Sequence, residues 1–282
     1  MNALTAGLYI VSTPIGNLDD ITLRSLEVLK KSDIILCEDT RRSLKLLNHY
    51  KIKKKLISYH KFNEQKELQK IIEYLNEGKI LSLISDAGTP ILSDPGLLLV
   101  KTCIEKSIKI FPIPGPSSIT AVTCVSGFDD KFLFYGFLPK TENDLVKTIS
   151  GLKNLDFSLV FFVPGIKINF YLKFFKEYFW GRDIFIAREI TKIHETFYRD
   201  KISTIKPFKT DLKGELTIVI SKIYNNSELE LESDEDIVSQ ASKYLRKYSL
   251  KDVVELISKK EKISKKKVYE ICLKIKNDKT NN

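Results

Sequence analysis

The stretch LISDAGTPILSDPG, Leu83 to Gly96, decides the fold class of this chain. The apolar run Ile80 to Ile84 predicts a strand that leads into it, and the run Leu97 to Ile104 predicts a helix after it. A loop at the carboxyl end of a strand is where open α/β sheets bind ligands. Its small residues allow a ligand to approach the backbone, and Asp86 and Thr89 offer polar contacts. Taken alone, the loop is equally compatible with an ordinary capped turn.

Two further loops have the same character. TPIGNLDDIT (Thr13–Thr22) follows the predicted strand Leu8–Ser12, and IPGPSSITA (Ile113–Ala121) follows the predicted strand Lys109–Pro112. The carboxyl ends of parallel strands meet at one edge of a sheet. We therefore expect the three loops to converge on one binding cleft.

The order of the elements predicts an α/β fold. Strands and helices alternate through residues 1–113, which favours a parallel sheet with helices on both faces, and the later strands of residues 114–225 have fewer helices between them, which favours a mixed sheet. An acidic stretch, 225–236, is predicted to be a linker within a third segment, 226–282. The remaining predicted strands are Ile34–Cys37, Lys55–Ser58, Phe132–Phe137, Ser158–Val163, Asp183–Glu189, Glu195–Asp200 and Leu216–Ser221.

Composition favours a globular protein with a polyanionic partner. The 282 residues are 43% hydrophobic, enough for a large core, and the net charge is +10. The four cysteines are far apart and none pairs with a histidine at zinc-site spacing, so no metal site is expected. We find no signal peptide pattern and no apolar run near the ~20 residues of a membrane span, and we expect a cytoplasmic protein without membrane contact.

With these three loops, the chain resembles the tetrapyrrole methylase superfamily and, within it, the branch of bacterial ribosomal RNA ribose methylases. Tetrapyrrole enzymes usually carry Gly-Pro-Gly-Asp where this chain has Pro14–Asn17, and Gly-Gly-Asp-Pro where it has Ala87–Pro90; both departures are those of the ribosomal RNA branch. These two sites lie in the similar segments Thr13–Arg41 and Leu83–Gly96. The other similar segments are Ile57–Glu64, Pro114–Ser118, Phe134–Pro139, Ala187–Glu195 and Leu212–Glu215.

The resemblance implies two α/β domains of the tetrapyrrole methylase type, with S-adenosylmethionine in a cleft between them, plus a small C-terminal helical unit. It also implies a homodimer that methylates a cytidine ribose 2′-hydroxyl in 16S ribosomal RNA, in the small ribosomal subunit. Carried over position by position, the residues expected to bind the donor are Ile15, Gly16, Asp86, Ala87, Gly88, Thr89, Leu92, Ser117, Ser118, Phe162, Val163 and Ile190.

Charged residues in apolar surroundings are the candidates for the chemical step. In EDTRR (Glu38–Arg42) we expect Asp39 and Arg41 to point towards the cleft, and REITKIHE (Arg188–Glu195) contributes Lys192 and Glu195. A carboxylate or a lysine of lowered pKa could take the hydroxyl proton, whereas Arg41, Lys192 and Lys213 could instead hold RNA phosphates. No motif identifies the base. Further candidates are His60, Asn63, Glu64, Arg188, Glu189, Lys213 and Glu215.

Short helices are predicted at Ile237–Lys247, Leu250–Lys260 and Lys265–Lys276, with Ser249 and Ser264 as N-caps. The last two have helix-turn-helix proportions and could bring Lys265, Lys266 and Lys267 to RNA phosphates, or they could form a small cap that leaves its lysines in solvent. Two other functions stay open: a methylase of a tetrapyrrole or other small molecule, and a non-catalytic nucleic-acid-binding protein.

Overall fold

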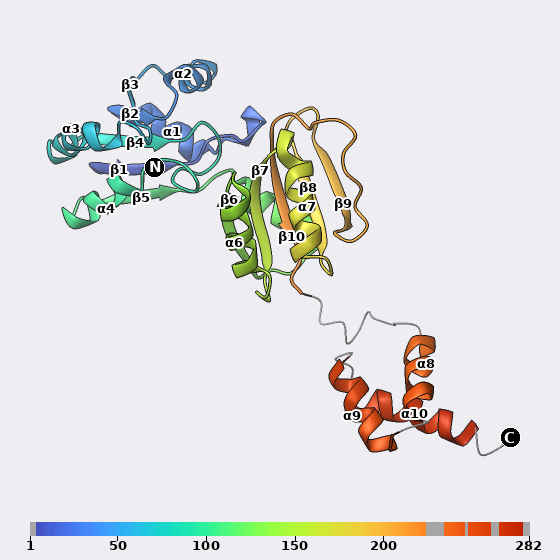
Figure 1. Ribbon diagram of the computed structural model, residues 1–282. Coiled ribbons are helices and arrows are strands. Elements are labelled where there is room, and N and C mark those ends of the chain that lie inside the picture. The colour runs from blue at the N-terminus through green and yellow to red at the C-terminus, as the bar shows by residue number, and fades with distance from the viewer. Residues whose placement is uncertain (1–3, 224–233, 246–247, 261–264, 279–282) are drawn as a thin grey trace. The chain divides into compact units, whose positions relative to one another are not determined.

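The computed structural model describes residues 4–223, 234–245, 248–260 and 265–278, which belong to two compact units. The first, Met1–Ile223, holds both sheets, and the second, Tyr224–Asn282, holds three helices (Figure 1). No helix of the described part is long and apolar enough to cross a membrane.

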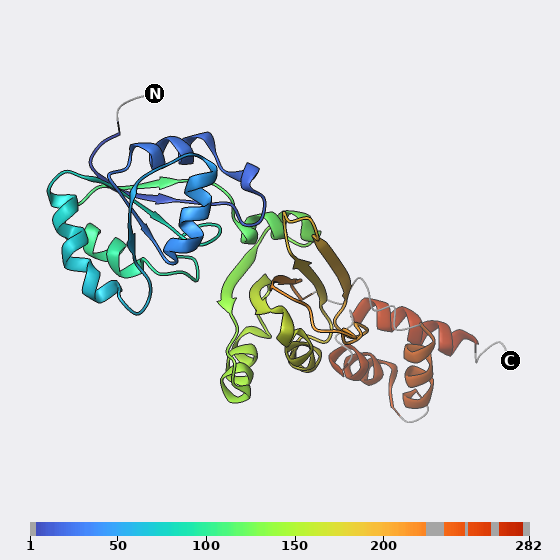
Figure 2. The ribbon, with the colours of Figure 1, turned by 90° about the horizontal axis from the view of Figure 1, so that it is seen from above.

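The first sheet is fully parallel, with the strand order β3-β2-β4-β1-β5. Its central strands are apolar on both sides because helices cover both faces (Figure 2). Leu8 and Leu36 pack towards α3 and α4, and Val11 and Ile35 pack towards α1 and α2. The elements are β1 (Gly7–Val11), η1 (Leu18–Asp20), α1 (Leu23–Lys31), β2 (Ile34–Cys37), α2 (Thr40–His49), β3 (Lys55–Ser58), α3 (Glu64–Asn76), β4 (Ile80–Ile84), α4 (Leu97–Glu105) and β5 (Ile110–Ile113).

The second sheet is mixed, with the order β6-β7-β10-β8-β9. Only β6 and β7 run parallel, and the other neighbours are antiparallel. One face is covered by α6 and α7 and the other by α5. The elements are α5 (Ser118–Ser126), β6 (Phe132–Phe137), α6 (Glu142–Leu152), β7 (Ser158–Pro164), η2 (Gly165–Lys167), α7 (Ile168–Tyr178), β8 (Asp183–Arg188), β9 (Thr196–Lys201) and β10 (Glu215–Ile220).

The α/β prediction is confirmed, with a parallel sheet followed by a mixed one. The described strands agree with the predicted ones within one residue at each end, because most of them are apolar runs bounded by turn residues. The division into domains at residue 113 stays a prediction, since both sheets lie in the one compact unit.

A buried arginine, Arg182, joins several elements at the end of the second sheet where β7 and β8 begin and β10 ends. Arg182 is 3% exposed, and its guanidinium donates to the carbonyl oxygens of Lys153 and Leu155, both at 2.8 Å, and of Ser221 at 3.2 Å and Phe157 at 3.4 Å. Burial lowers the pKa of Arg182 to about 10. One side chain thus joins the end of α6 to strands β7, β8 and β10.

The second unit is built from α8 (Asp234–Tyr244), α9 (Leu250–Lys260) and α10 (Lys265–Asp278) around Ala241, Val253, Ile257, Val268 and Cys272. Residues 234–236 of the predicted linker belong to α8, so that part of the prediction is wrong, and residues 225–233 lie outside the described part. The hydroxyl of Ser249 accepts from the amide of Asp252 at 3.3 Å, which confirms it as a cap, whereas Ser264 lies outside the described residues.

Candidate functional site

The three small-residue loops meet as predicted. The amide of Thr13 donates to the carbonyl of Gly88 at 2.9 Å, and the amide of Gly88 donates to the carbonyl of Thr13 at 3.0 Å. The hydroxyl of Thr89 lies 3.1 Å from that of Ser12 and donates to the carbonyl of Pro116 at 3.2 Å. Thr89 therefore fastens the central loop to both of its neighbours.

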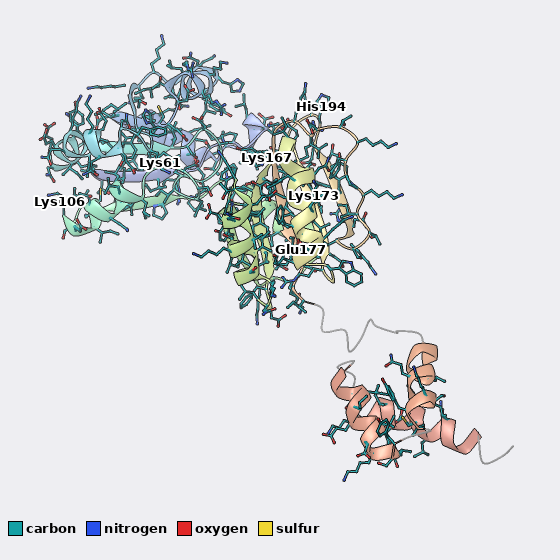
Figure 3. All side chains as sticks on the ribbon, in the orientation of Figure 1. Lys61, Lys106, Lys167, Lys173, Glu177 and His194 are labelled. Carbon is teal, nitrogen blue, oxygen red and sulfur yellow. The ribbon has the colours of Figure 1, made fainter. Side chains whose placement is uncertain are left out.

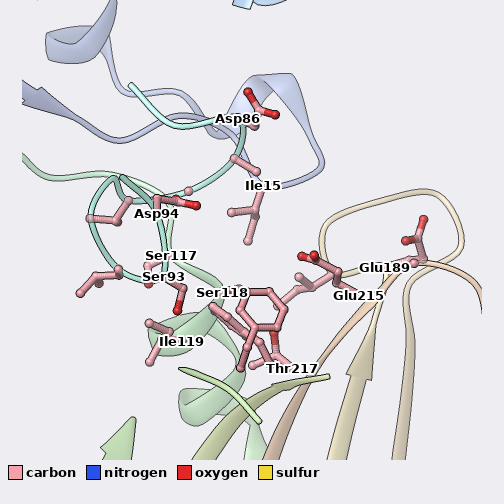
Figure 4. Close-up of a pocket in the computed structure, with 18 of the residues that line it drawn as sticks. Ile15, Asp86, Ser93, Asp94, Ser117, Ser118, Ile119, Glu189, Glu215 and Thr217 are labelled. Carbon is pink, nitrogen blue, oxygen red and sulfur yellow. The ribbon is translucent and has the colours of Figure 1, made fainter. Parts of the chain in front are cut away.

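A cavity of about 610 Å³ lies where these loops face the second sheet (Figure 4). The volume falls within the range of about 300–1,000 Å³ that is usual for small-molecule sites. It is lined by Ile15, Glu38, Arg42, Asp86, Ala87, Gly88, Thr89, Leu92, Ser93, Asp94, Ser117, Ser118, Ile119, Phe137, Phe162, Glu189, Ile190, Lys192, Gly214, Glu215 and Thr217.

The structure gathers all but two of the residues expected to bind the donor. Gly16 and Val163 are not in the lining. Successive residues of a strand face opposite sides of the sheet, so Phe162 faces the cavity while Val163 is fully buried in the core beneath it. Gly16 instead packs against the loop after β8, where an added Cβ would lie 2.6 Å from the carbonyl oxygen of Ile190. Their donor contacts stay a prediction.

Gly88 shows why the central loop needs a glycine. Its φ of +77° is a left-handed conformation that other residues adopt only with strain, and an added Cβ would lie 3.2 Å from Cγ2 of Ile15. The glycine thus lets the first and second loops pass close together at the cavity wall.

In EDTRR the structure places different residues in the cavity from those expected. Glu38 and Arg42 line it, and Asp39 and Arg41 do not. Asp39 is the N-cap of α2 and also accepts from the Arg41 side chain at 2.7 and 3.1 Å, which lowers the pKa of Asp39 far below its usual range. The Arg41 side chain is 87% exposed. The capping role keeps Asp39 out of the cavity lining, because its carboxylate accepts from the amide of Arg41, two residues further along the chain.

Asp86 lies at the centre of a polar junction between the first-sheet loops. Its carboxylate forms an ion pair with Nη1 of Arg42 at 3.2 Å and accepts a hydrogen bond from the amide of Asp39 at 3.2 Å. These contacts tie the start of α2 to the loop after β4 and neutralise one cavity carboxylate.

The loop after β8 forms the opposite wall. Nζ of Lys192 donates to Glu189 at 3.0 Å, and the Glu195 carboxylate accepts from the amide of Thr191 at 2.7 Å. Lys192 lines the cavity, whereas Glu195 shapes the turn from outside the lining. The hydroxyl of Thr191 also accepts from the amide of Asn17 at 3.0 Å, so this wall is joined to the first loop.

The other candidate side chains have local partners. Nδ1 of His60 accepts from the amide of Phe62 at 3.3 Å, and the side chain of Asn63 accepts from the amide of His60 at 2.8 Å. Nε of Arg188 donates to the carbonyl of Lys213 at 3.3 Å. None of these residues lines the cavity.

Several cavity residues escaped the sequence analysis. Strand periodicity past Cys37 could have identified Glu38, and Asp94 lies within the stretch that decides the fold. Burial, together with a smaller contribution from the carboxylate of Glu38, raises the pKa of Asp94 to about 6. The rest are Arg42, Ser93, Ile119, Phe137, Gly214 and Thr217. Glu189 and Glu215 also line the cavity and are among the candidates for the chemical step.

The cavity is acidic although the protein is basic. Five carboxylates line it, from Glu38, Asp86, Asp94, Glu189 and Glu215, against the cations of Arg42 and Lys192. Within the described residues no group of three or more metal-binding side chains is placed to hold a metal ion. The arrangement suits a cationic small molecule that presents polar groups to the backbone of the loops.

Comparisons with known proteins agree with this geometry. The profile of the tetrapyrrole (corrin/porphyrin) methylases matches residues 7–206. A protein of Thermotoga maritima named ribosomal RNA small subunit methyltransferase I is 45% identical over 76% of this chain and 97% of its own. Its namesake in Rickettsia prowazekii is 44% identical over 97% of this chain and 98% of its own.

Solved structures share the fold of the sheet-containing unit. A diphthine synthase superposes with a TM-score of 0.58 at 15% identity, covering 76% of this chain and 89% of its own. The uroporphyrin-III C-methyl transferase of Thermus thermophilus, solved with S-adenyl homocysteine, gives 0.55 at 12% identity, covering 77% and 98%. With the family profile matched over most of its length, the chain belongs to the tetrapyrrole (corrin/porphyrin) methylase family.

Proposed function

We propose that this protein transfers the methyl group of S-adenosylmethionine to a cytidine ribose 2′-hydroxyl of small-subunit (16S) ribosomal RNA. The observation that carries the proposal is the convergence of three small-residue loops on one acidic cavity, in a chain whose relatives are named for methylating this RNA.

The cavity fits the donor chemically. S-adenosylmethionine supplies a methyl group on a sulfonium that leaves as a neutral thioether. Cavity carboxylates complement its sulfonium and ammonium charges, and the Ser117, Ser118 and Thr217 hydroxyls offer hydrogen bonds to its polar groups. Phe162, half-buried beside Phe137 with ring centroids 5.3 Å apart, gives an apolar surface for a flat base.

The protein's part in the reaction is alignment and proton removal. Holding donor and acceptor in line is worth on the order of 7–11 kcal/mol in favourable systems. The joined loops supply this rigidity, because Thr89 and Thr191 connect the walls by hydrogen bonds. Lys192 lies at the cavity, where it can meet a phosphate of the acceptor strand.

The surface charge supports an RNA partner. The net charge of +10 is distributed over the chain, with Lys61 beside the first sheet and Lys167 and Lys173 beside the second (Figure 3). Positive charge of this kind raises the rate and strength of RNA association in a salt-dependent way. We place the reaction in the cytoplasm, on RNA of the small ribosomal subunit, and infer a homodimer.

The three terminal helices are proposed to assist RNA binding rather than the reaction. The Thermotoga relative is matched over nearly its whole length by about three quarters of this chain, so the reaction is proposed to need only the unit that holds the two sheets. The exposed Lys265 at the start of α10 is available for a phosphate contact.

The test measures donor binding and methyl transfer separately. Calorimetric titration with S-adenosylmethionine should show one site, and tritium from labelled donor should appear in small ribosomal subunits or their RNA. Nucleoside analysis should then recover 2′-O-methylcytidine. Label in a base rather than a ribose would overturn the ribose assignment, and no label in any RNA would overturn the substrate.

A second candidate is a methylase of a tetrapyrrole, which the family's name and the uroporphyrin enzyme's fold allow. An incubation with a uroporphyrinogen and labelled donor distinguishes the two. We expect no transfer, because the departures at Pro14–Asn17 and Ala87–Pro90 set this chain apart from the tetrapyrrole enzymes.

A further inference from the structure

We infer that the Asp94 carboxylate is the base that takes the proton from the acceptor hydroxyl, and that Glu38 tunes its basicity. The inference rests on the proposed methyl transfer to a hydroxyl and adds a residue that the sequence analysis did not select. It follows from comparing the five carboxylates of the cavity.

Three of these carboxylates have other partners or lie open to solvent. Asp86 is bound to Arg42 and to the amide of Asp39. Glu189 is bound to Lys192, and Glu215 is exposed at the start of β10. A carboxylate held by a cation is stabilised as the anion and is a weak base.

Glu38 and Asp94 remain, both half-buried. In the described part of the chain no lysine, arginine or histidine forms an ion pair with either one. Glu38 directly follows β2, and Asp94 lies in the loop after β4, on the side of the cavity opposite Glu189 and Glu215 (Figure 4). The charge of Glu38 raises the pKa of Asp94. Burial and Asp86 raise the pKa of Glu38 itself, but the nearby His60 and Arg42 oppose them. By contrast, no cation among the described residues opposes the rise in the pKa of Asp94.

Asp94 is the one with the greater proton affinity. The groups that face it are the Ser85 hydroxyl and Asp86 from its own loop, Glu38 from β2 and Glu215 from β10. Burial, followed by the carboxylates of Glu38, Asp86 and Glu215, raises its pKa to about 6, and the Ser85 hydroxyl opposes them. A base of this strength is largely ionised at neutral pH and still binds a proton well.

The backbone around Asp94 is held in an uncommon conformation. Ile91 and Ser93 have positive φ values of 77° and 73°, and Ser93 packs against Gly136 of β6, where an added Cβ would lie 2.9 Å from its hydroxyl. Strained residues of this kind persist where the surrounding structure fixes them, typically at functional sites. The loop thus holds Asp94 in a defined position.

The reaction balances without another reagent. The hydroxyl oxygen attacks the methyl carbon as its proton passes to Asp94, the carbon–sulfur bond breaks, and its electron pair returns to sulfur to give a neutral thioether. Asp94 then releases the proton to water. The products are the methyl ether, the thioether and a proton.

The experiment is a pH–rate profile of kcat/KM for methyl transfer to the RNA by the full-length protein. The parent should lose activity tenfold per pH unit below about pH 6, since Asp94 must be ionised. Asp94→Asn should lower the rate at pH 8 by about 10²–10⁴-fold, and its profile should lack the fall in activity below about pH 6, which is the acid limb. Its donor affinity, measured by calorimetry, should stay within a few fold of the parent's. Asp94→Glu should restore part of the rate together with an acid limb.

Glu38→Gln should move the acid limb to lower pH without removing it, because a neutral side chain no longer disfavours the Asp94 anion. The matched control is Asp183→Asn. Asp183 is also half-buried with its pKa raised mainly by burial, but it starts β8 outside the cavity lining, and the profile should not change.

Two results would overturn the inference. The first is an Asp94→Asn variant that keeps the parent's rate and the acid limb of its pH–rate profile. The second is an acid limb that is lost in Glu38→Gln but kept in Asp94→Asn, which would make Glu38 the base. A parent protein that binds the donor but does not methylate RNA would overturn the proposed function, and the inference that rests on it would fall for that separate reason.

Discussion

Thr13 and Gly88 exchange two backbone hydrogen bonds, amide to carbonyl in both directions, at 2.9 and 3.0 Å. Residues 75 positions apart in the chain thereby form a two-residue antiparallel bridge between loops that leave parallel strands. The bridge sets the distance between the first and second loops at the cavity wall. Its geometry depends on the left-handed backbone of Gly88.

Gly88→Val should weaken donor binding by more than tenfold. The new side chain strains the backbone, costing about 1–2 kcal/mol, and meets Ile15 at the cavity. Gly78→Val is the matched control, because Gly78 has a similar φ of +80° but no atom within 4 Å of an added Cβ. Calorimetry should show weak binding only for the Gly88 variant. Equal affinity in both folded variants would contradict the assignment of this loop.

Lys192→Ala should lower methyl transfer to RNA more than donor affinity, because its ammonium group lies at the cavity while holding Glu189. Glu195→Ala should have a smaller effect, since that carboxylate supports the turn at Thr191 from outside the lining. Steady-state kinetics with separate donor titrations will distinguish them. An equal loss of donor affinity and turnover in Lys192→Ala would assign this residue to the donor.

The Asp94→Asn variant should unfold at a higher temperature than the parent at pH 7.5. The pKa of Asp94 is raised from 3.8 to about 6 in the folded protein, so its protonated form favours folding, and that stabilisation is lost as the pH rises through about 6. Asparagine stays neutral at every pH. The difference in melting temperature should therefore be small near pH 4 and reach its full size above pH 6; a constant difference would contradict the shifted pKa.

A chain truncated after Ile223 should fold and bind donor like the full-length protein, because the cores of both sheets lie within the first unit. Its affinity for ribosomal RNA should fall, with a shallower dependence on salt. Lys265→Glu in the full chain should reproduce part of this change. Filter binding at several salt concentrations measures both. Unchanged affinity and salt slope in both proteins would leave the helices without an RNA role.

Much of the fold was predictable because the signals were local. Apolar runs ending in turn residues located the strands, and the small-residue loops located the cavity edge. Helix α2 fits the expected alternation of strands and helices, although TRRSLKLLNH carries few apolar residues, and its start depends on the Asp39 cap. The sequence did not show which of the neighbours Glu38 and Asp39 faces the cavity. Glu38 lines it, whereas the side chain of Asp39 caps α2 and lies outside the lining.

Asp94 could not be identified from sequence for a different reason. Its proton affinity arises from burial and from Glu38, which lies 56 positions earlier in the chain. Such a property exists only once β2 and β4 lie side by side. The same holds for Arg42, which lines the cavity by pairing with Asp86 across two loops.

The Arg182 contacts bear on how the second sheet folds. Its guanidinium bonds to carbonyls 25 to 39 positions away in sequence, so the contacts require α6, β7, β8 and β10 to be in place together. We expect contacts with such requirements to form late, after the folding transition state, so that Arg182 has a φ-value near zero. Shortening Arg182 should therefore accelerate unfolding far more than it slows folding, and this one residue would set how long the folded sheet survives once formed.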